Sequence, residues 1–309
     1  MKAQQVPIRI DHGNERGKIM HVVFGATGRA GGETARALIE RGEDVRIVLR
    51  RAEQAAHWKG AEVQVAIASM EDAGAVAAAL EGASGAFLLN PPPLADDPYA
   101  RTEEIGAALA EGARRARLPK AVVLSSVGAQ HASGTGVVAT LNRLETLLDR
   151  AATATVFLRP GYFVETWSEA AEAAITKGVL PTFLDPAQKI PMVSTIDVGR
   201  AAAQLLCEDW TGRRIVGLGG PEDWSAGDVA ASFANVLGRA VTPAFVPPDQ
   251  RAAILAAAGV RDEVASALLQ MYDAIASGKV AHEPATELWR GTVQLTAAIE
   301  RIVSVVPAA

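Results

Sequence analysis

The sequence has a single cysteine, Cys207, among its 309 residues. One thiol can form neither an intramolecular disulfide nor a thiolate cluster, so we expect no disulfide framework and no multi-cysteine metal site. Cys207 follows two leucines and is predicted to be a small buried hydrophobic residue. The five histidines are scattered without the spacing of a chelating pair, so the sequence predicts no metal site.

Long apolar runs and an excess of basic charge are absent as well. No apolar stretch approaches the roughly 18 residues that span a bilayer, and the first 19 residues lack the apolar core of a signal peptide. The formal net charge of −5 disfavours broad contact with nucleic-acid phosphates. We therefore expect a cytoplasmic protein whose partner is a small-molecule substrate, with no nucleic-acid and no membrane partner.

A glycine-rich turn in residues 21–31 is the most informative feature that is present. An apolar run leads into three glycines spaced G-x-x-G-x-x-G, and an amphipathic helix pattern follows. A strand that turns sharply into a helix beside a pyrophosphate needs glycine for the turn, for the close backbone approach and for helix packing. The helix start also offers N–H groups to a phosphate. This context favours a dinucleotide site over a purely structural turn. The predicted cofactor-binding residues here are Gly25, Thr27, Gly28, Arg29, Ala30 and Gly31.

Strand-like and helix-like segments alternate along the chain, which is typical of a parallel sheet covered on both faces. Strands are expected at 19–24, 45–49, 63–67, 85–90, 121–125 and 155–159, with helices at 31–41, 72–80, 101–116 and 137–150. The pattern loosens after residue 160, where we expect a strand at 214–218, a helix after Ser225 and helices at 249–258 and 262–276. The predicted fold is α/β: a Rossmann-type doubly wound parallel sheet with a smaller C-terminal lobe.

The same pattern predicts how the chain is divided. Residues 1–19 form an N-terminal extension, and residues 20–160 form the NAD(P)-binding domain, to which later segments return. Residues 161–309 form mainly a smaller lobe.

The end of the second predicted strand indicates which cofactor is bound. An acidic residue there would bind the ribose 2′-hydroxyl of NAD, whereas arginine suits the 2′-phosphate of NADP. The strand runs into Arg50 and Arg51 without an acidic residue. A guanidinium can hold two phosphate oxygens at once, so Arg50 favours NADP, with NAD as the alternative. The other interpretation is that both arginines are simply solvated.

Three further strand ends should lie at the same edge of the sheet, because ligands of open parallel sheets bind beyond the carboxyl ends of the strands. The first segment, with Asn90, Pro91 and Pro92, is expected beside the adenosine half of the cofactor. The second, with Ser125 and Ser126, and the third, with Pro160, Gly161 and Tyr162, are expected beside the nicotinamide. Alternatively, the second and third segments are only strand-end turns.

Four segments together resemble the NmrA-like group of the atypical short-chain dehydrogenases. They are residues 24–31, 88–93, 124–129 and 158–163, in consistent order within a resemblance that covers about residues 20–206. The resemblance implies a Rossmann-type domain, binding of NADP or NAD, and a substrate cleft against a small C-terminal lobe. Residues 161–309 would then form mainly the substrate-binding lobe. This group includes reductases of quinones and dyes, and also cofactor-binding regulators that catalyse no reaction.

The chain departs from the wider superfamily in its catalytic residues. Classical members use a tyrosine with a lysine four residues later, and the lysine lowers the pKa of the phenol that protonates a carbonyl. Here the residues four positions after Tyr99, Tyr162 and Tyr272 are Glu, Thr and Ala, so no such pair exists.

Hydride transfer to an easily reduced acceptor does not need that pair, because the nicotinamide carries the chemistry and the protein positions the reactants. The predicted catalytic residues are Ser126 and Tyr162, which would hydrogen-bond a substrate oxygen, and Asn142, which would position the nicotinamide ribose. The sequence thus predicts an NAD(P)H-dependent oxidoreductase acting on a quinone-like or other small conjugated acceptor. The alternative is a non-catalytic NAD(P)-sensing regulator that acts through a protein partner. A homodimer is compatible with either.

Overall fold

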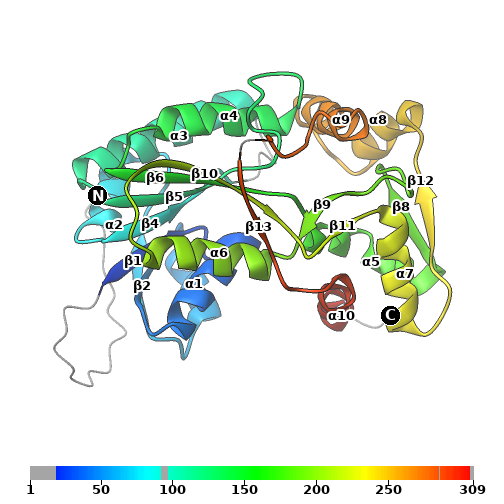
Figure 1. Cartoon of the computed structure of the whole chain (residues 1–309), viewed down its shortest axis with the longest axis horizontal. Helices are drawn as coiled ribbons and strands as arrows, with labels where there is room; N and C mark the ends of the chain where they lie inside the picture. The colour runs from blue at the N-terminus through cyan, green and yellow to red at the C-terminus, as the bar shows by residue number, and fades with distance from the viewer. Residues whose placement is uncertain (1–18, 92–96, 285, 307–309) are drawn as a thin grey trace.

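The structure is a computed structural model that describes residues 19–91, 97–284 and 286–306. The predicted extension, residues 1–19, lies outside the described residues apart from the exposed Ile19. Figure 1 shows a large sheet with helices on both faces, beside a second, smaller lobe that contains most of the C-terminal half. Within the described ranges, no helix is both long and apolar enough to cross a membrane.

The main sheet has eight strands in the order β13-β10-β6-β5-β4-β1-β2-β3, and every neighbouring pair is parallel. The strands are β1 (Met20–Phe24), β2 (Asp44–Leu49), β3 (Val63–Ile67), β4 (Gly85–Leu88), β5 (Lys120–Leu124), β6 (Ala154–Pro160), β10 (Gly212–Gly219) and β13 (Glu287–Arg290). The direction of the crossovers reverses between β1 and β4, which makes this point the topological switch of a doubly wound sheet. The predicted fold class is confirmed.

Helices cover both faces of the sheet (Figure 1). One face carries α1 (Arg29–Glu40) and α6 (Thr195–Cys207), and the other carries α2 (Ala73–Leu80), α3 (Pro98–Arg115) and α4 (Val137–Leu148). Helices α1 and α6 pack closely, because a β-carbon on Gly199 of α6 would lie 2.4 Å from the backbone of Glu33 in α1. A short 3₁₀ helix, η1 (Ala52–Trp58), follows β2.

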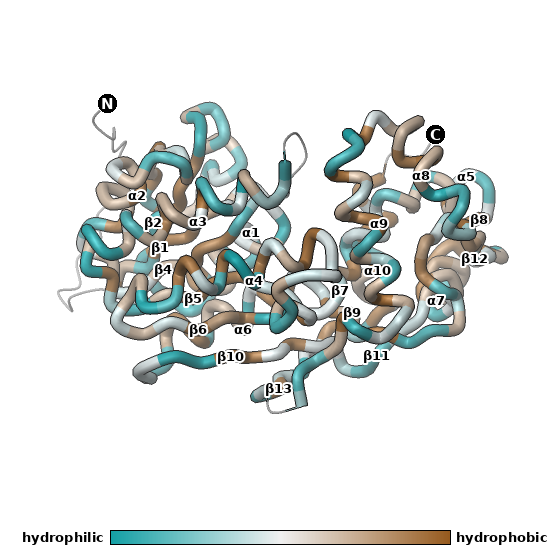
Figure 2. The backbone as a smooth tube through the Cα atoms, turned by 90° about the horizontal axis from the view of Figure 1, so that it is seen from above, coloured by the Kyte–Doolittle hydropathy of each residue, from teal (hydrophilic) through white to brown (hydrophobic). Residues whose placement is uncertain are grey.

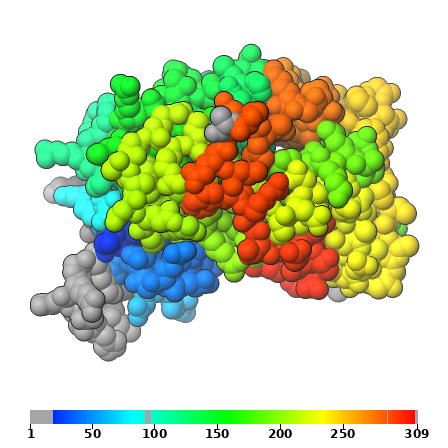
Figure 3. Space-filling model, in the orientation of Figure 1, coloured from blue at the N-terminus to red at the C-terminus, as the bar shows by residue number. Residues whose placement is uncertain are grey.

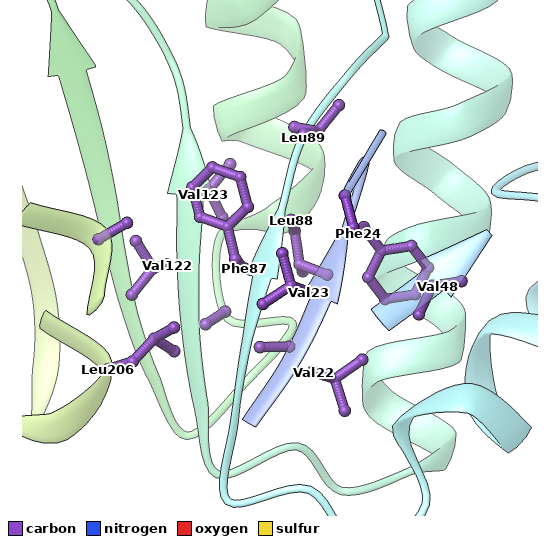
Figure 4. Close-up of a cluster of buried hydrophobic side chains, with 14 of the residues drawn as sticks. Val22, Val23, Phe24, Val48, Phe87, Leu88, Leu89, Val122, Val123 and Leu206 are labelled. Carbon is purple, nitrogen blue, oxygen red and sulfur yellow. The ribbon is translucent and has the colours of Figure 1, made fainter. Parts of the chain in front are cut away.

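Burial on both faces of the main sheet explains why the sequences of its strands are nearly continuous apolar runs. Strands of a parallel sheet are buried on both faces, so both sets of alternating side chains must be apolar. Figure 4 shows Val22 and Val23 of β1 on opposite sides of the strand, with Phe87 of β4 and Leu206 of α6 among the residues of this cluster. All four side chains are at most 2% exposed.

The second lobe has a hydrophobic core of its own, which includes Trp167, Met192, Phe233 and Ile299. Figure 2 shows it beside the main sheet, seen from above. Its strands are β7 (Tyr162–Phe163), β9 (Ile190–Val193) and β11 (Asp223–Trp224) in one small sheet, and β8 (Val179–Thr182) with β12 (Thr242–Phe245) in another; its helices are η2 (Val164–Glu169), α5 (Ala171–Lys177), α7 (Ala226–Leu237), α8 (Pro248–Ala257), α9 (Asp262–Ala276) and α10 (Leu295–Val305).

Candidate cofactor and substrate site

The structure brings the predicted site segments to a single edge of the main sheet. Gly25 follows β1, Arg50 follows β2, Asn90 lies just beyond β4, Ser125 follows β5 and Gly161 follows β6. Because these strands are parallel, their carboxyl ends meet at one edge, where open α/β sheets bind ligands. The turn after β1 and the segment after β4 flank the topological switch.

The glycine turn has a specific requirement for glycine at two of its three positions. Gly25 has a φ of +67°, which favours a residue without a β-carbon. A β-carbon on Gly31 would lie 2.4 Å from the carbonyl oxygen of Gly25, so α1 could not pack this closely on the turn. The N–H of Gly28 donates to the same oxygen at 2.8 Å. These contacts hold the start of α1 directly above the end of β1.

The start of α1 is accessible to a ligand. Thr27, Gly28 and Arg29 are exposed, whereas Ala30 is buried against the sheet. Gly28, the residue before the helix, has no side chain that could cap the first N–H groups. An anion at this position would meet unsatisfied N–H groups and the positive end of the helix dipole.

Arg29 is directed toward the second lobe. Its Nη2 donates to Oγ of Ser168 at 3.0 Å and lies 3.7 Å from Oε1 of Glu169, both in η2. Arg29 therefore links the glycine turn to the second lobe.

Arg50 is exposed at the carboxyl end of β2. The backbone N–H groups of Arg50 and Arg51 donate to Oε1 of Gln54, at 3.2 and 3.1 Å, and this fixes the turn into η1. Among the described residues, no hydrogen bond or ion pair involves the guanidinium of Arg50. The group is therefore free to contact a ligand.

Asn90 carries an unsatisfied acceptor at the switch point. Its Nδ2 donates to Oγ1 of Thr102 at 2.7 Å, but its buried Oδ1 has no hydrogen-bond partner in the part of the chain that the structure describes. Buried polar atoms usually have a partner, so this oxygen suits a ligand hydroxyl, such as that of a ribose. Pro91 is partly buried beside it, and the predicted residue Pro92 lies outside the described residues.

Ser125 belongs to a buried polar network that the sequence reasoning missed. Its hydroxyl donates to Oε1 of Glu145 at 2.5 Å, and the guanidinium of Arg159 binds both oxygens of the same carboxylate. Burial disfavours the charge on Arg159, but its bonds to Glu145 and to Glu283 outweigh this and raise the pKa of the guanidinium. An arginine inside an otherwise apolar strand was the available signal, because a buried charge requires a partner.

Ser126 and Asn142 shape the loop after β5. The partly buried hydroxyl of Ser126 donates to the carbonyl of Val127 at 3.0 Å. Nδ2 of Asn142 donates to the carbonyl of Ala129 at 2.8 Å and so ties α4 to this loop. Both polar groups thus hold the backbone at the predicted nicotinamide end.

Tyr162 lies where β6 passes into the second lobe. Pro160 is buried at the end of β6, and the next residue must be glycine because a β-carbon on Gly161 would lie 2.3 Å from the carbonyl oxygen of Pro191. The ring of Tyr162 lies 6.2 Å from that of Trp167, centroid to centroid. Burial raises the pKa of the Tyr162 phenol well above its usual range, and a hydrogen bond with Tyr272 adds to this effect. Tyr272, on α9, was not predicted as a site residue.

Comparison with known proteins shows the family of the chain. The sequence model of the NmrA-like family matches residues 17–301 of the chain. The chain belongs to the NmrA-like family.

Three similar proteins are reductases. The chain is 25% identical over 253 residues to an NAD(P)H azoreductase of Xenophilus azovorans, a match that covers 82% of this chain and 86% of the relative. The triphenylmethane reductase of Citrobacter sp., in complex with NADP(H), has a TM-score of 0.77 at 19% identity, covering 92% and 99% of the two chains. An NADPH-dependent quinone oxidoreductase of Escherichia coli has a TM-score of 0.73 at 22% identity, with 92% and 99% covered. At these identities, the two structural matches establish the fold.

Proposed function

We propose that this protein is an NAD(P)H-dependent reductase that transfers hydride to a small conjugated acceptor such as a quinone, an azo dye or a triarylmethane dye. The observation that carries the proposal is the glycine turn, in which Gly31 lets α1 begin directly over the carbonyl of Gly25. The exposed helix start and Asn90, whose Oδ1 is unsatisfied, follow the neighbouring strands β1 and β4. The azoreductase relative and the two reductase structures support the same class of reaction.

The cofactor that fits these residues is NADP. The N–H groups at the start of α1 would hold the pyrophosphate, and Oδ1 of Asn90 would accept a hydrogen bond from a ribose hydroxyl. Arg50 would pair with the 2′-phosphate, since its guanidinium is exposed at the end of β2. The bound nicotinamide would supply the hydride.

The acceptor would lie against the aromatic side chains at the start of the second lobe. Tyr162 and Trp167 form one pair of rings there, and Tyr272 reaches the phenol of Tyr162 from α9. The phenol of Tyr162 is protonated at neutral pH, as its raised pKa also requires, and can donate a hydrogen bond to an acceptor oxygen. An easily reduced acceptor then takes its proton from water, which is consistent with the missing tyrosine–lysine pair.

The test is NADPH oxidation by the purified protein with a panel of quinones, azo dyes and triarylmethane dyes. We expect oxidation above the uncatalysed background with at least one acceptor, and a lower KM for NADPH than for NADH. The variant Gly31→Ala, assayed in parallel, should abolish the rate because the helix start is displaced. Tight NADPH binding without turnover of any acceptor would refute the reductase and favour the regulator.

A further inference from the structure

Three potential metal ligands from distant parts of the chain meet at the edge of the main sheet opposite to the glycine turn. His21 is the second residue of β1, Glu43 precedes β2, and Cys207 is the last residue of α6. Their ligand atoms all lie within 4.8 Å of one another. No spacing in the sequence reveals this cluster, because its members are 22 and 164 residues apart.

His21 is the decisive member of the cluster. It is 1% exposed, and neither nitrogen of its ring has a hydrogen-bond partner among the described residues. Its Nδ1 faces Gly85, where a β-carbon would lie 3.5 Å away. Its Nε2 faces Glu43, 3.5 Å from Oε2, which is too long for a good hydrogen bond. The buried Nε2 of His21 is thus directed into the cluster with only this long contact to Glu43, although buried polar groups nearly always have a well-formed hydrogen bond.

We propose that Nε2 of His21, the carboxylate of Glu43 and Sγ of Cys207 bind a Zn²⁺ ion. Imidazole, carboxylate and thiolate together suit zinc, whereas magnesium and calcium prefer sets of oxygen ligands. With bonds of roughly 2.0–2.3 Å, tetrahedral ligands lie about 3.3–3.8 Å apart. The cluster must therefore contract by about 1 Å at its widest, which rotation of the partly exposed Glu43 side chain can provide. Water would complete the tetrahedron.

The charges around the cluster are compatible with a divalent cation. Two positive groups, Arg41 and Lys120, act on the cluster. Nζ of Lys120 donates to the carbonyls of Leu206, at 3.0 Å, and Glu208, so its ammonium is held at the end of α6. The carboxylate of Glu43 and the thiolate of Cys207 supply two negative charges to the ion. Because zinc binds the thiolate, the ion must displace the proton of the Cys207 thiol when it binds.

The position of the cluster indicates a structural ion. It joins the beginning of β1, the turn before β2 and the end of α6, at the amino ends of the strands. The proposed cofactor site lies at their carboxyl ends. Zinc binding should therefore stabilise the fold and leave the rate of acceptor reduction unchanged, so this inference stands or falls independently of the proposed function.

The experiment uses Co²⁺ as a spectroscopic substitute for Zn²⁺. The full chain is dialysed against a chelator, freed of it and titrated with Co²⁺. We expect one equivalent to bind with a thiolate-to-cobalt charge-transfer band, and Zn²⁺ to displace it. Cys207→Ser should lose the band, and Glu43→Gln should bind Co²⁺ at least about tenfold more weakly. His57→Gln, a variant of an exposed histidine in η1, should behave as the wild type.

A second readout is the thermal midpoint, Tm. Zn²⁺ should raise Tm of the wild type and of His57→Gln, but not of Cys207→Ser. The absence of Co²⁺ binding, a bound Co²⁺ without the charge-transfer band, or equal Co²⁺ affinity in the wild type and Cys207→Ser would each overturn the proposal.

Discussion

Arg159 on β6 and Glu145 on α4 form a two-point ion pair inside the protein, with Nε–Oε1 and Nη2–Oε2 distances of 2.8 and 2.7 Å. Both side chains are about 5% exposed. The hydroxyl of Ser125 donates to the same carboxylate. The pair thus fixes α4 against the carboxyl ends of β5 and β6, under the proposed nicotinamide end of the site.

Removing one partner of this pair should be costly. Glu145→Ala leaves the guanidinium of Arg159 buried with only the half-exposed Glu283 as a partner, and we expect a loss of about 3–5 kcal/mol in the free energy of unfolding. Urea denaturation measures it. The matched control is Glu103→Ala, which breaks an exposed pair with Arg143 and should leave stability unchanged. Equal losses in the two variants would contradict the structural role of the buried pair.

Gly31→Ala should prevent cofactor binding. The added methyl group would lie 2.4 Å from the carbonyl oxygen of Gly25, so α1 must move away from the turn. We expect NADPH affinity, measured by fluorescence titration, to fall below detection, with a loss of roughly 1–3 kcal/mol in stability. Gly74→Ala, in the first turn of α2, meets only the side chain of Asp72 and should retain wild-type affinity.

Arg50→Asp should change the preference between the two cofactors. A hydrogen-bonded charge pair contributes about 1.5–3 kcal/mol, so we expect NADPH affinity to fall roughly 10- to 100-fold, with a much smaller effect on NADH. The control Arg41→Asp makes the same charge change at the exposed end of α1 and should affect neither cofactor. Equal losses of NADPH and NADH affinity in Arg50→Asp would contradict the proposed phosphate contact.

Tyr162→Phe should impair the reaction with an oxygen-containing acceptor and leave cofactor binding intact. Loss of one neutral hydrogen bond, about 0.5–1.5 kcal/mol, predicts a 2- to 13-fold lower kcat/KM. Because the pKa of this phenol is raised, the wild-type kcat/KM should not fall as pH approaches 10, the ordinary pKa of tyrosine. Tyr99→Phe is the control, since Tyr99 is exposed on α3. An unchanged kcat/KM in Tyr162→Phe would remove this residue from the substrate site.

His282 should make the fold sensitive to mild acid. Burial, assisted by the positive charge of Arg290, lowers the pKa of His282. Below about pH 6.5 the unfolded chain binds a proton at this residue that the folded chain resists. Stability is therefore full above that pH and is lost as pH falls through the lowered folded pKa.

The measurement is Tm between about pH 7 and pH 5, in the wild type and in His282→Gln. We expect Tm to decline less steeply with acid in the variant. The control His57→Gln, at an exposed position, should follow the wild type. A variant with the wild-type slope would show that His282 does not couple stability to pH.

Seven strands of the main sheet were predicted, including the one at 214–218 that is β10, and all are present with ends shifted by at most two residues. They could be predicted because each is a local apolar run between turn residues. The helix predicted after Ser225 is α7, and Ser225 and Asp228 cap its start with reciprocal hydrogen bonds. In contrast, β13 has four mostly exposed residues and belongs to the sheet only because β10 lies beside it.

The missed site residues are all defined by contacts between distant segments. In the sequence, Glu145 is one more polar residue of a predicted helix, and only the fold shows that it pairs with Arg159. In the sequence, Tyr272 is part of a predicted amphipathic helix, and only the fold shows that α9 places it next to Tyr162. Cys207, predicted to be buried, is only partly buried, because it ends its helix beside Glu43 at the surface.

The chain passes between the main sheet and the second lobe several times. After β9 it returns for α6 and β10, it leaves again for α7, α8 and α9, and it comes back for β13 before ending at α10. Figure 3 shows the orange-red segment around β13 lying across the front of the molecule between the two parts. Neither lobe is therefore a contiguous piece of polypeptide. A single proteolytic cut would not release one lobe from the other, and expression of residues 20–160 alone would omit two strands of the sheet.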